Sequence, residues 1–143
     1  MDALLGDKMK YLFLTLMLTF STFSFADCPM KFPSESLCGE LNWIKGPLLN
    51  VKSHFQFKFW KDGDTEKTPV SPNATVKIYS WMTMANGHDH GGPSMTSRET
   101  STGVFEVNDA RFFMHGMRGY WEVVIDLIND GIKTDSARYK VQF

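Results

Sequence analysis

The sequence has little cysteine, no excess of charge of either sign, and few segments in which apolar residues recur with a helical period. The 143-residue chain contains two cysteines and has a formal net charge of −1. Nucleic-acid binding depends on a basic surface, so this charge balance predicts no nucleic-acid partner. The chain also has no G-x-S-x-G motif, no cysteine in an activating context and no recognisable pair of catalytic carboxylates. We therefore do not expect an enzyme.

Only one long apolar run is present, and it lies near the start of the chain. Tyr11–Phe25 carries no charge, follows Lys8 and Lys10, and precedes the small residue Ala26. This order is typical of a secretory signal peptide, here residues 1–26. The run is shorter than the roughly 20 residues of a membrane span, so we expect a periplasmic or secreted domain of residues 27–143 with no membrane span. An uncleaved signal, or a lipid on Cys28, would instead keep the protein attached to the membrane.

The two cysteines, Cys28 and Cys38, lie close together in the sequence. An exported chain enters an oxidising compartment, where such a pair forms a disulfide. Closing so short a loop stabilises the fold by roughly 2–3 kcal/mol in the chain-entropy description. A pair of thiolate metal ligands is the alternative, although the spacing is not the C-x2-C of a zinc site. We predict a disulfide that ties "CPMKFPSESLC" to the first strand.

Alternating apolar and polar residues dominate the chain after residue 26 and predict strands. The clearest cases are residues 37–44, 51–60, 74–82, 120–128 and 138–143. "NDGIK" at 129–133 predicts a tight hairpin with Gly131 in a left-handed conformation. About seven short strands and no helix predict an all-β fold, an immunoglobulin-like antiparallel β-sandwich. A small barrel is the alternative.

Methionine and histidine, which are soft or intermediate metal ligands, concentrate in two segments. These are "WMTMANGHDHGGPSM" at 81–95 and "FMHGMRGYW" at 113–121. Thioethers bind Cu(I), whereas imidazole binds both Cu(I) and Cu(II). The candidate copper ligands are Met84, His88, His90, Met114, His115 and Met117. Alternatively, Met82 and Met114 belong to the core, and "GHDHGG" is a solvated turn or an adventitious zinc or nickel binder.

The two segments can form one site only if the chain between them brings them to the same end of the sandwich. Residues 103–113 ("GVFEVNDARFF") form either one strand with a bulge at Asn108-Asp109 or a hairpin that reverses there. An Asn-Asp pair without a following glycine is a weak two-residue turn. We therefore predict one bulged strand and a shared end for the two segments.

The pattern of residues in these segments resembles the FixH-like and YtkA-like exported immunoglobulin-like domains. The resemblance extends over residues 55–127 and includes Trp81, Met82, Met84, Gly87, His88, Gly103, Phe105, Val107, Phe113, Met114, Gly119 and Trp121. It implies a β-sandwich with a role in copper handling or cytochrome oxidase maturation. His115-x-Met117 also resembles the His-x-Met ending of PCuAC-type periplasmic copper chaperones.

Taken together, these features favour a periplasmic copper-binding protein, which would act as a chaperone, a buffer or a resistance factor. The expected partners are the metal ion and an envelope copper protein or an oxidase-assembly protein. The alternative is a protein-interaction module of the cell envelope that binds no metal. Its docking residues would be exposed aromatics such as Trp60, Trp81 and Tyr120.

Overall fold

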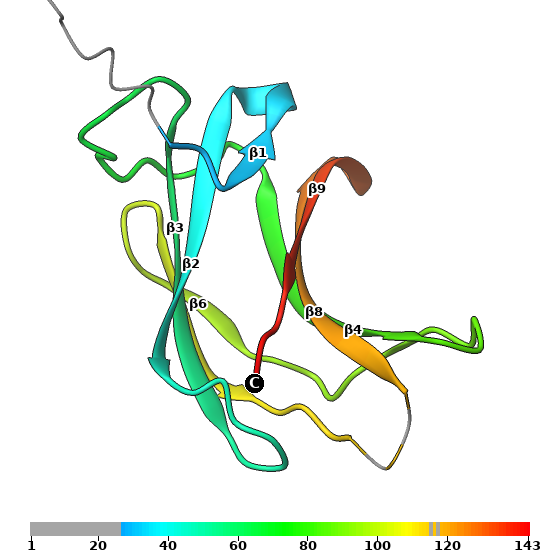
Figure 1. The fold of residues 1–143 in the computed structure, drawn as a ribbon. Coiled ribbons are helices and arrows are strands. Elements are labelled where there is room, and N and C mark those ends of the chain that lie inside the picture. The colour runs from blue at the N-terminus through cyan, green and yellow to red at the C-terminus, as the bar shows by residue number, and fades with distance from the viewer. Residues whose placement is uncertain (1–26, 115, 117) are drawn as a thin grey trace, which may run out of the picture.

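The computed structural model describes residues 27–114, 116 and 118–143, and these fold into two facing antiparallel sheets (Figure 1). The first sheet has the order β1 (Met30–Phe32), β2 (Leu37–Lys45), β3 (Ser53–Lys61), β7 (Val104–Ala110) and β6 (Ser97–Ser101). The second has the order β5 (His90–Gly91), β4 (Thr75–Met84), β8 (Gly119–Asn129) and β9 (Ile132–Lys140). A short 3₁₀ turn, η1 (Pro33–Glu35), joins β1 to β2.

The strand order confirms the predicted immunoglobulin-like sandwich. The order β2-β3-β7-β6 corresponds to strands A-B-E-D of that fold, and β5-β4-β8-β9 corresponds to C′-C-F-G. About seven strands were expected and nine are present in the described residues, because β1 and β5 are short additions of three and two residues. The predicted signal peptide, residues 1–26, lies outside the described residues.

The core lies between the sheets and is built from the alternating residues seen in the sequence. On β3, Phe55, Phe57 and Phe59 are fully buried, and on β8, Ile125 and Leu127 are fully buried. Phe57 and Phe59 meet edge to face, with ring centroids 4.9 Å apart. Fully burying a side chain of this size stabilises the fold by about 1.5–3 kcal/mol. Burial of these alternating side chains between the two sheets therefore stabilises the packing of one sheet on the other.

The last hairpin has the predicted turn but a longer final strand than expected. Asp130 and Gly131 both have positive φ, at 49° and 76°, and Asn129 pairs with Ile132. This is the two-residue turn that favours glycine. The final strand was predicted at 138–143, but it runs over Ile132–Lys140 because pairing with β8 begins directly after the turn. Phe143 is not a core residue, since 54% of it is exposed.

The predicted disulfide between Cys28 and Cys38 is present, with the two Cα atoms 5.3 Å apart. Cys38 lies in β2, whereas Cys28 precedes β1. β1 folds back on β2 as a neighbouring antiparallel strand, pairing Met30 with Gly39. The disulfide therefore closes a small hairpin at the edge of the first sheet, as the sequence predicted.

The chain does not reverse at Asn108-Asp109, because β7 continues through both residues. Ser53 pairs with Ala110 and Phe55 pairs with Val107, so β7 has one residue more than β3 across this interval. That extra residue is a β-bulge. The prediction of one bulged strand is confirmed. The segment after β7 and the turn after β4 consequently lie at the same end of the sandwich (Figure 1).

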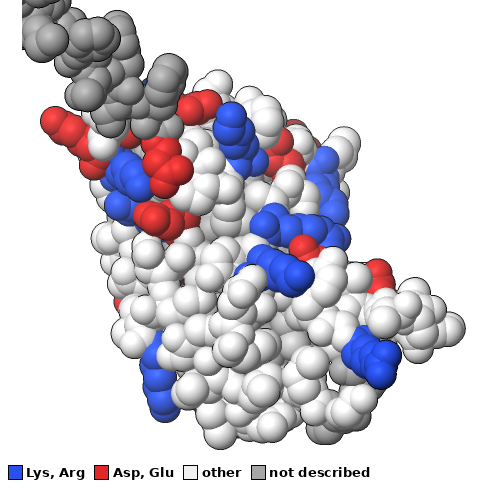
Figure 2. Space-filling view, in the orientation of Figure 1, with Lys and Arg blue, Asp and Glu red and all other residues white. Residues whose placement is uncertain are grey.

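Charge is distributed unevenly over the surface. Figure 2 shows acidic side chains gathered toward the end of the molecule that carries β1 and the loop after β3. The opposite end, below β3 and β7 in this view, is largely white with Lys or Arg at its two sides. The Met- and His-rich turns belong to this second end (Figure 1).

Candidate metal site at one end of the sandwich

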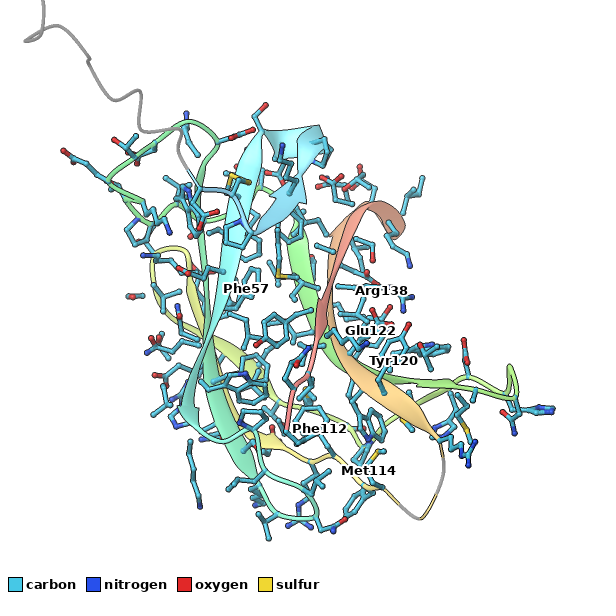
Figure 3. The ribbon with its side chains drawn as sticks, viewed as in Figure 1. Phe57, Phe112, Met114, Tyr120, Glu122 and Arg138 are labelled. Atoms are coloured by element: carbon cyan, nitrogen blue, oxygen red, sulfur yellow. A yellow bond between two sulfur atoms is a disulfide. The ribbon has the colours of Figure 1, made fainter. Side chains whose placement is uncertain are left out.

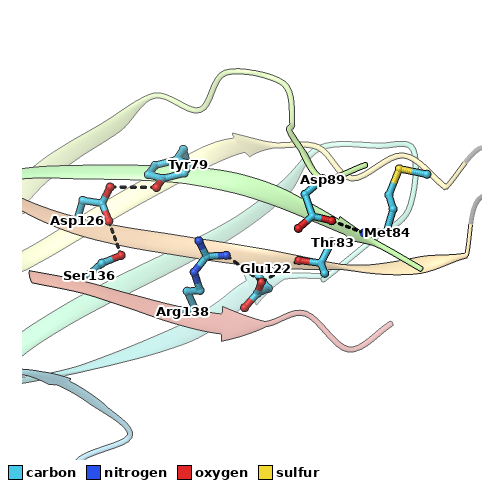
Figure 4. A network of polar contacts seen from close by, with 8 residues as sticks. All are labelled: Tyr79, Thr83, Met84, Asp89, Glu122, Asp126, Ser136 and Arg138. Atoms are coloured by element: carbon cyan, nitrogen blue, oxygen red, sulfur yellow. Dashed lines mark hydrogen bonds and ion pairs between the residues drawn. The ribbon is translucent and has the colours of Figure 1, made fainter. Parts of the chain in front are cut away.

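The hairpin that joins β4 to β5 extends away from the body of the sandwich (Figure 1). Its turn closes with a hydrogen bond from the Gly87 amide to the Met84 carbonyl at 3.0 Å. The Asp89 carboxylate accepts a hydrogen bond from the Met84 amide at 3.0 Å (Figure 4). His88 is exposed near the tip, where its amide donates to the Asn86 side chain. Asp89 is therefore a residue that orders the turn, and His88 lies away from the sandwich body.

His90 lies at the base of the hairpin with one ring nitrogen engaged. It pairs with the fully buried Met82, so it lies on the inner face of the second sheet. Its ring stands edge-on to Trp121 with centroids 6.1 Å apart. Its Nδ1 is 2.9 Å from the Gly91 carbonyl oxygen. A carbonyl can only accept, so Nδ1 carries the hydrogen and the Nε2 lone pair is left to bind a metal. Metal-binding histidines commonly use this arrangement.

Met84 and Met114 are half-buried and pack against the edge of the core at the same end. The indole Nε1 of Trp121 donates to the Phe113 carbonyl at 3.0 Å, which fixes the backbone next to Met114. The indole therefore contacts both His90 and the segment that carries Met114. Figure 3 shows Met114 beyond Phe112 at this end of the sandwich.

The two ligand-rich segments are also joined directly. The Ala85 amide donates to the Arg118 carbonyl at 3.0 Å, and Met84 pairs with Gly119. A depression of about 270 Å³ lies here, lined by Met84, Ala85, Asn86 and Arg118. Met84 therefore lines this depression, beside the backbone contacts that join the two segments.

The six candidate ligands consequently fall into three groups. Met84, His90 and Met114 lie at the end of the sandwich near Trp121, whereas His88 lies on the projecting turn. The remaining two candidates, His115 and Met117, lie outside the described residues. Met82 is fully buried and belongs to the core, which was the alternative interpretation of the sequence.

Within the described residues, the only group of three or more His, Cys, Asp or Glu ligand atoms within 4.8 Å of one another comprises Cys28, Cys38 and Asp62. Both sulfurs of this group are consumed in the disulfide. They are not thiolates, so this group offers a metal only one carboxylate in the oxidised protein. Methionine thioethers are a different class of ligand, and Met84 and Met114 provide them at the opposite end of the sandwich.

The outer face of the second sheet carries a separate polar network (Figure 4). The Asp126 side chain is almost completely buried and accepts hydrogen bonds from Tyr79 Oη at 3.0 Å and Ser136 Oγ at 2.6 Å. Burial raises the pKa of Tyr79, and the bond to the Asp126 carboxylate raises this pKa further. Glu122 pairs with Arg138 at 3.1 Å on the same face. These contacts join β4, β8 and β9 and take no part in the candidate site.

Sequence reasoning missed two residues of this end and misplaced one aromatic. Trp121 was assigned to a strand face by its alternation, but its contacts with His90 and Phe113 depend on neighbours distant in sequence. Asp89 was not proposed as a site residue. Trp60 was proposed as an exposed docking residue, but it is fully buried because the loop after β3 covers it: Trp60 forms a bridge with Pro69, and Lys67 Nζ lies 4.9 Å from the centroid of its ring.

Comparison of the chain with protein-family models, with curated proteins and with solved structures gives no match. Over residues 27–114, 116 and 118–143, the structure contains no helix of the length and apolar character needed to cross a membrane. Inferences about function therefore rest on the residues and their arrangement.

Proposed function

We propose that this chain is an exported copper-binding protein whose site uses Met84, His90 and Met114. The observation that carries the proposal is the environment of His90. Its Nδ1 lies 2.9 Å from the Gly91 carbonyl, its ring stands edge-on to Trp121, and the residue is exposed, which leaves Nε2 as the nitrogen that can bind a metal. An imidazole oriented in this way needs no rearrangement to bind a metal.

The half-buried thioethers favour copper over other metals. Methionine sulfur is neutral and polarisable, so it binds Cu(I) better than it binds Zn²⁺ or Mg²⁺. His115 and Met117, in the same connecting segment as Met114, are additional ligands in this proposal. Imidazole binds Cu(II) as well, so the site would hold both oxidation states. The disulfide agrees with export to an oxidising compartment.

The mechanism follows from the openness of this end. Met84 lines a depression that is open to solvent, and His90 is exposed. A metal held by a few ligands at an accessible edge can be passed on by exchanging one ligand at a time with a partner. The protein would then act as a copper chaperone or buffer that serves another envelope copper protein.

A competition titration with a chromogenic Cu(I) chelator tests this proposal. We expect the purified protein to bind about one equivalent of Cu(I). His90→Ala and Met114→Leu should each weaken the affinity by at least roughly tenfold, the lower limit found when a residue that merely orients a ligand is lost. Leucine preserves the volume of the half-buried methionine, so this variant isolates the thioether.

The matched control is His54→Ala. His54 lies on β3, with its Nε2 3.9 Å from the Glu106 carboxylate. It therefore belongs to the first sheet, whereas His90 belongs to the second. This variant should bind copper as the parent protein does. If the parent protein takes copper from the chelator no better than free histidine does, the proposal is wrong. The interaction module that binds no metal would then be the remaining alternative.

A further inference from the structure

A cluster of exposed apolar side chains covers the end of the sandwich beside the candidate site. Five of the seven large hydrophobic residues exposed in the described chain belong to it, and we call these five the end patch: Ile44, Leu48, Leu49, Val51 and Phe143. Ile44 and Val51 are 54% and 51% exposed. Contiguous exposed apolar residues of this kind mark interaction sites in folded proteins.

The buried residue Phe112 connects parts of the end patch that are far apart in the sequence. Leu49 forms a parallel bridge with Phe112, and the Asn50 amide donates to the Phe112 carbonyl at 2.8 Å. The rings of Phe112 and Phe143 have centroids 5.7 Å apart. The loop between β2 and β3 therefore lies against the segment after β7 and against the last residue.

The charged residues around the end patch are predominantly basic. Four exposed cations flank it: Lys45, Lys52, Arg111 and Arg118. None of the four forms an ion pair within the described part of the chain. The acids nearest in sequence to Arg111 and Arg118 are engaged, since Asp109 accepts from the Thr96 amide and Glu122 pairs with Arg138. Figure 2 shows this end as white surface with Lys or Arg at its sides.

We propose that the end patch docks this protein onto the surface of an anionic lipid bilayer. Leu48, Leu49 and Val51 lie together on an exposed loop, from which apolar side chains can enter the boundary between headgroups and acyl chains. The unpaired cations beside them would then meet lipid phosphates. This charge complementarity selects an anionic membrane over a neutral one.

Docking in this orientation would hold Met114 near the membrane surface, because Met114 lies beyond Phe112, the residue that the patch meets (Figure 3). The proposal goes beyond copper binding and does not depend on it. Vesicle binding is measured without metal, so its failure would leave the copper proposal untouched. Failure of the copper titration would likewise leave the lipid proposal untouched.

Co-sedimentation with lipid vesicles tests the proposal. We expect the metal-free protein to bind vesicles containing phosphatidylglycerol and to bind pure phosphatidylcholine vesicles much more weakly. Each basic residue near an anionic surface strengthens binding by roughly fivefold, so Lys45→Gln/Lys52→Gln should weaken it by about 25-fold. Leu49→Ser/Val51→Ser should also lose most of the binding. Added salt should weaken binding by screening the charges.

The matched controls are Ile132→Ser and Lys61→Gln, which alter an exposed apolar residue and an exposed lysine at the opposite end. Both should bind as the parent protein does, and circular dichroism should show every variant folded. Equal binding to the two vesicle types, or none to the anionic vesicles, would overturn the proposal. So would concentration-dependent self-association in the absence of lipid that Leu49→Ser/Val51→Ser abolishes, because the patch would then bind a second copy.

Discussion

Replacing Trp121 with phenylalanine should reduce both the stability of the sandwich and its affinity for copper. Trp121 is only 2% exposed, and its Nε1 donates to the Phe113 carbonyl at 3.0 Å. Its ring contacts His90 and Phe112 edge-on. Phenylalanine keeps an aromatic side chain at this position but removes the donor and part of the ring.

The expected loss of stability has two parts. Losing the hydrogen bond to this part-buried carbonyl costs about 0.5–1.5 kcal/mol. The space left by the missing ring atoms adds about 1 kcal/mol, below the cost of removing a whole aromatic side chain. The sum is about 1.5–2.5 kcal/mol. With a urea m-value of about 1–1.5 kcal/mol/M, the unfolding midpoint should fall by roughly 1–2.5 M.

The copper affinity should fall by roughly 10–100-fold, the range found when a residue that orients a metal ligand is removed. Trp43→Phe is the control, since Trp43 Nε1 donates at 3.3 Å to the partly exposed Tyr139 hydroxyl and has no bond to the Phe113 carbonyl. It should leave the copper affinity unchanged. If Trp121→Phe lowers the urea midpoint as expected but binds copper like the parent protein, Trp121 does not organise the site.

Three further predictions concern the fold. Cys28→Ser/Cys38→Ser should lower the free energy of unfolding by about 2–3 kcal/mol, because the disulfide spans 10 residues. Urea melts measure this loss. As the control, dithiothreitol should cause an equal loss in the parent protein. Tyr79 has a pKa raised above its ordinary value of 10.0, so its protonated form contributes stability below pH 10.0 that is lost as the pH rises through the folded-state pKa. Tyr79→Phe should therefore flatten the decline in unfolding free energy above that pH, and an unchanged decline would show that ionisation of Tyr79 is not its source. Gly103→Ala should cost about 1–3 kcal/mol, since a Cβ there would lie 2.5 Å from a carbonyl oxygen of the adjacent loop and φ is +71°; a melt like that of the parent protein would contradict this.

The strands were predictable because their signal is local. Alternation in residues 51–60 places Phe55, Phe57 and Phe59 on one face, and that face is buried in the structure. The turn at Asp130-Gly131 was equally predictable, because glycine tolerates the positive φ that a two-residue hairpin needs. The short strand β5 was not predicted, since two residues carry no periodicity.

The candidate site was only partly predictable. Methionine and histidine content identified the two segments, but composition cannot tell which side chains share a face. The structure separates His90, against Trp121, from His88 on the projecting turn. This separation depends on the pairing of His90 with Met82, which is a contact between strands. Trp60 was misplaced for a similar reason, because the loop that covers it through Pro69 and Lys67 meets β3 only in the folded chain.

The sequence alone determined the class of fold, the disulfide and the candidate soft ligands, because each depends on residue type and short spacing. The tertiary structure decided between the predicted bulged strand and the alternative hairpin at Asn108-Asp109. β7 continues through both residues with one bulged residue, so the segment after it reaches the end of the sandwich that carries the β4–β5 turn. The same folding brings Leu49 and Phe143 to Phe112, although the sequence separates them widely. Within a hairpin the turn sets the register, but the order of strands in a sheet depends on pairings between segments that are far apart in the sequence.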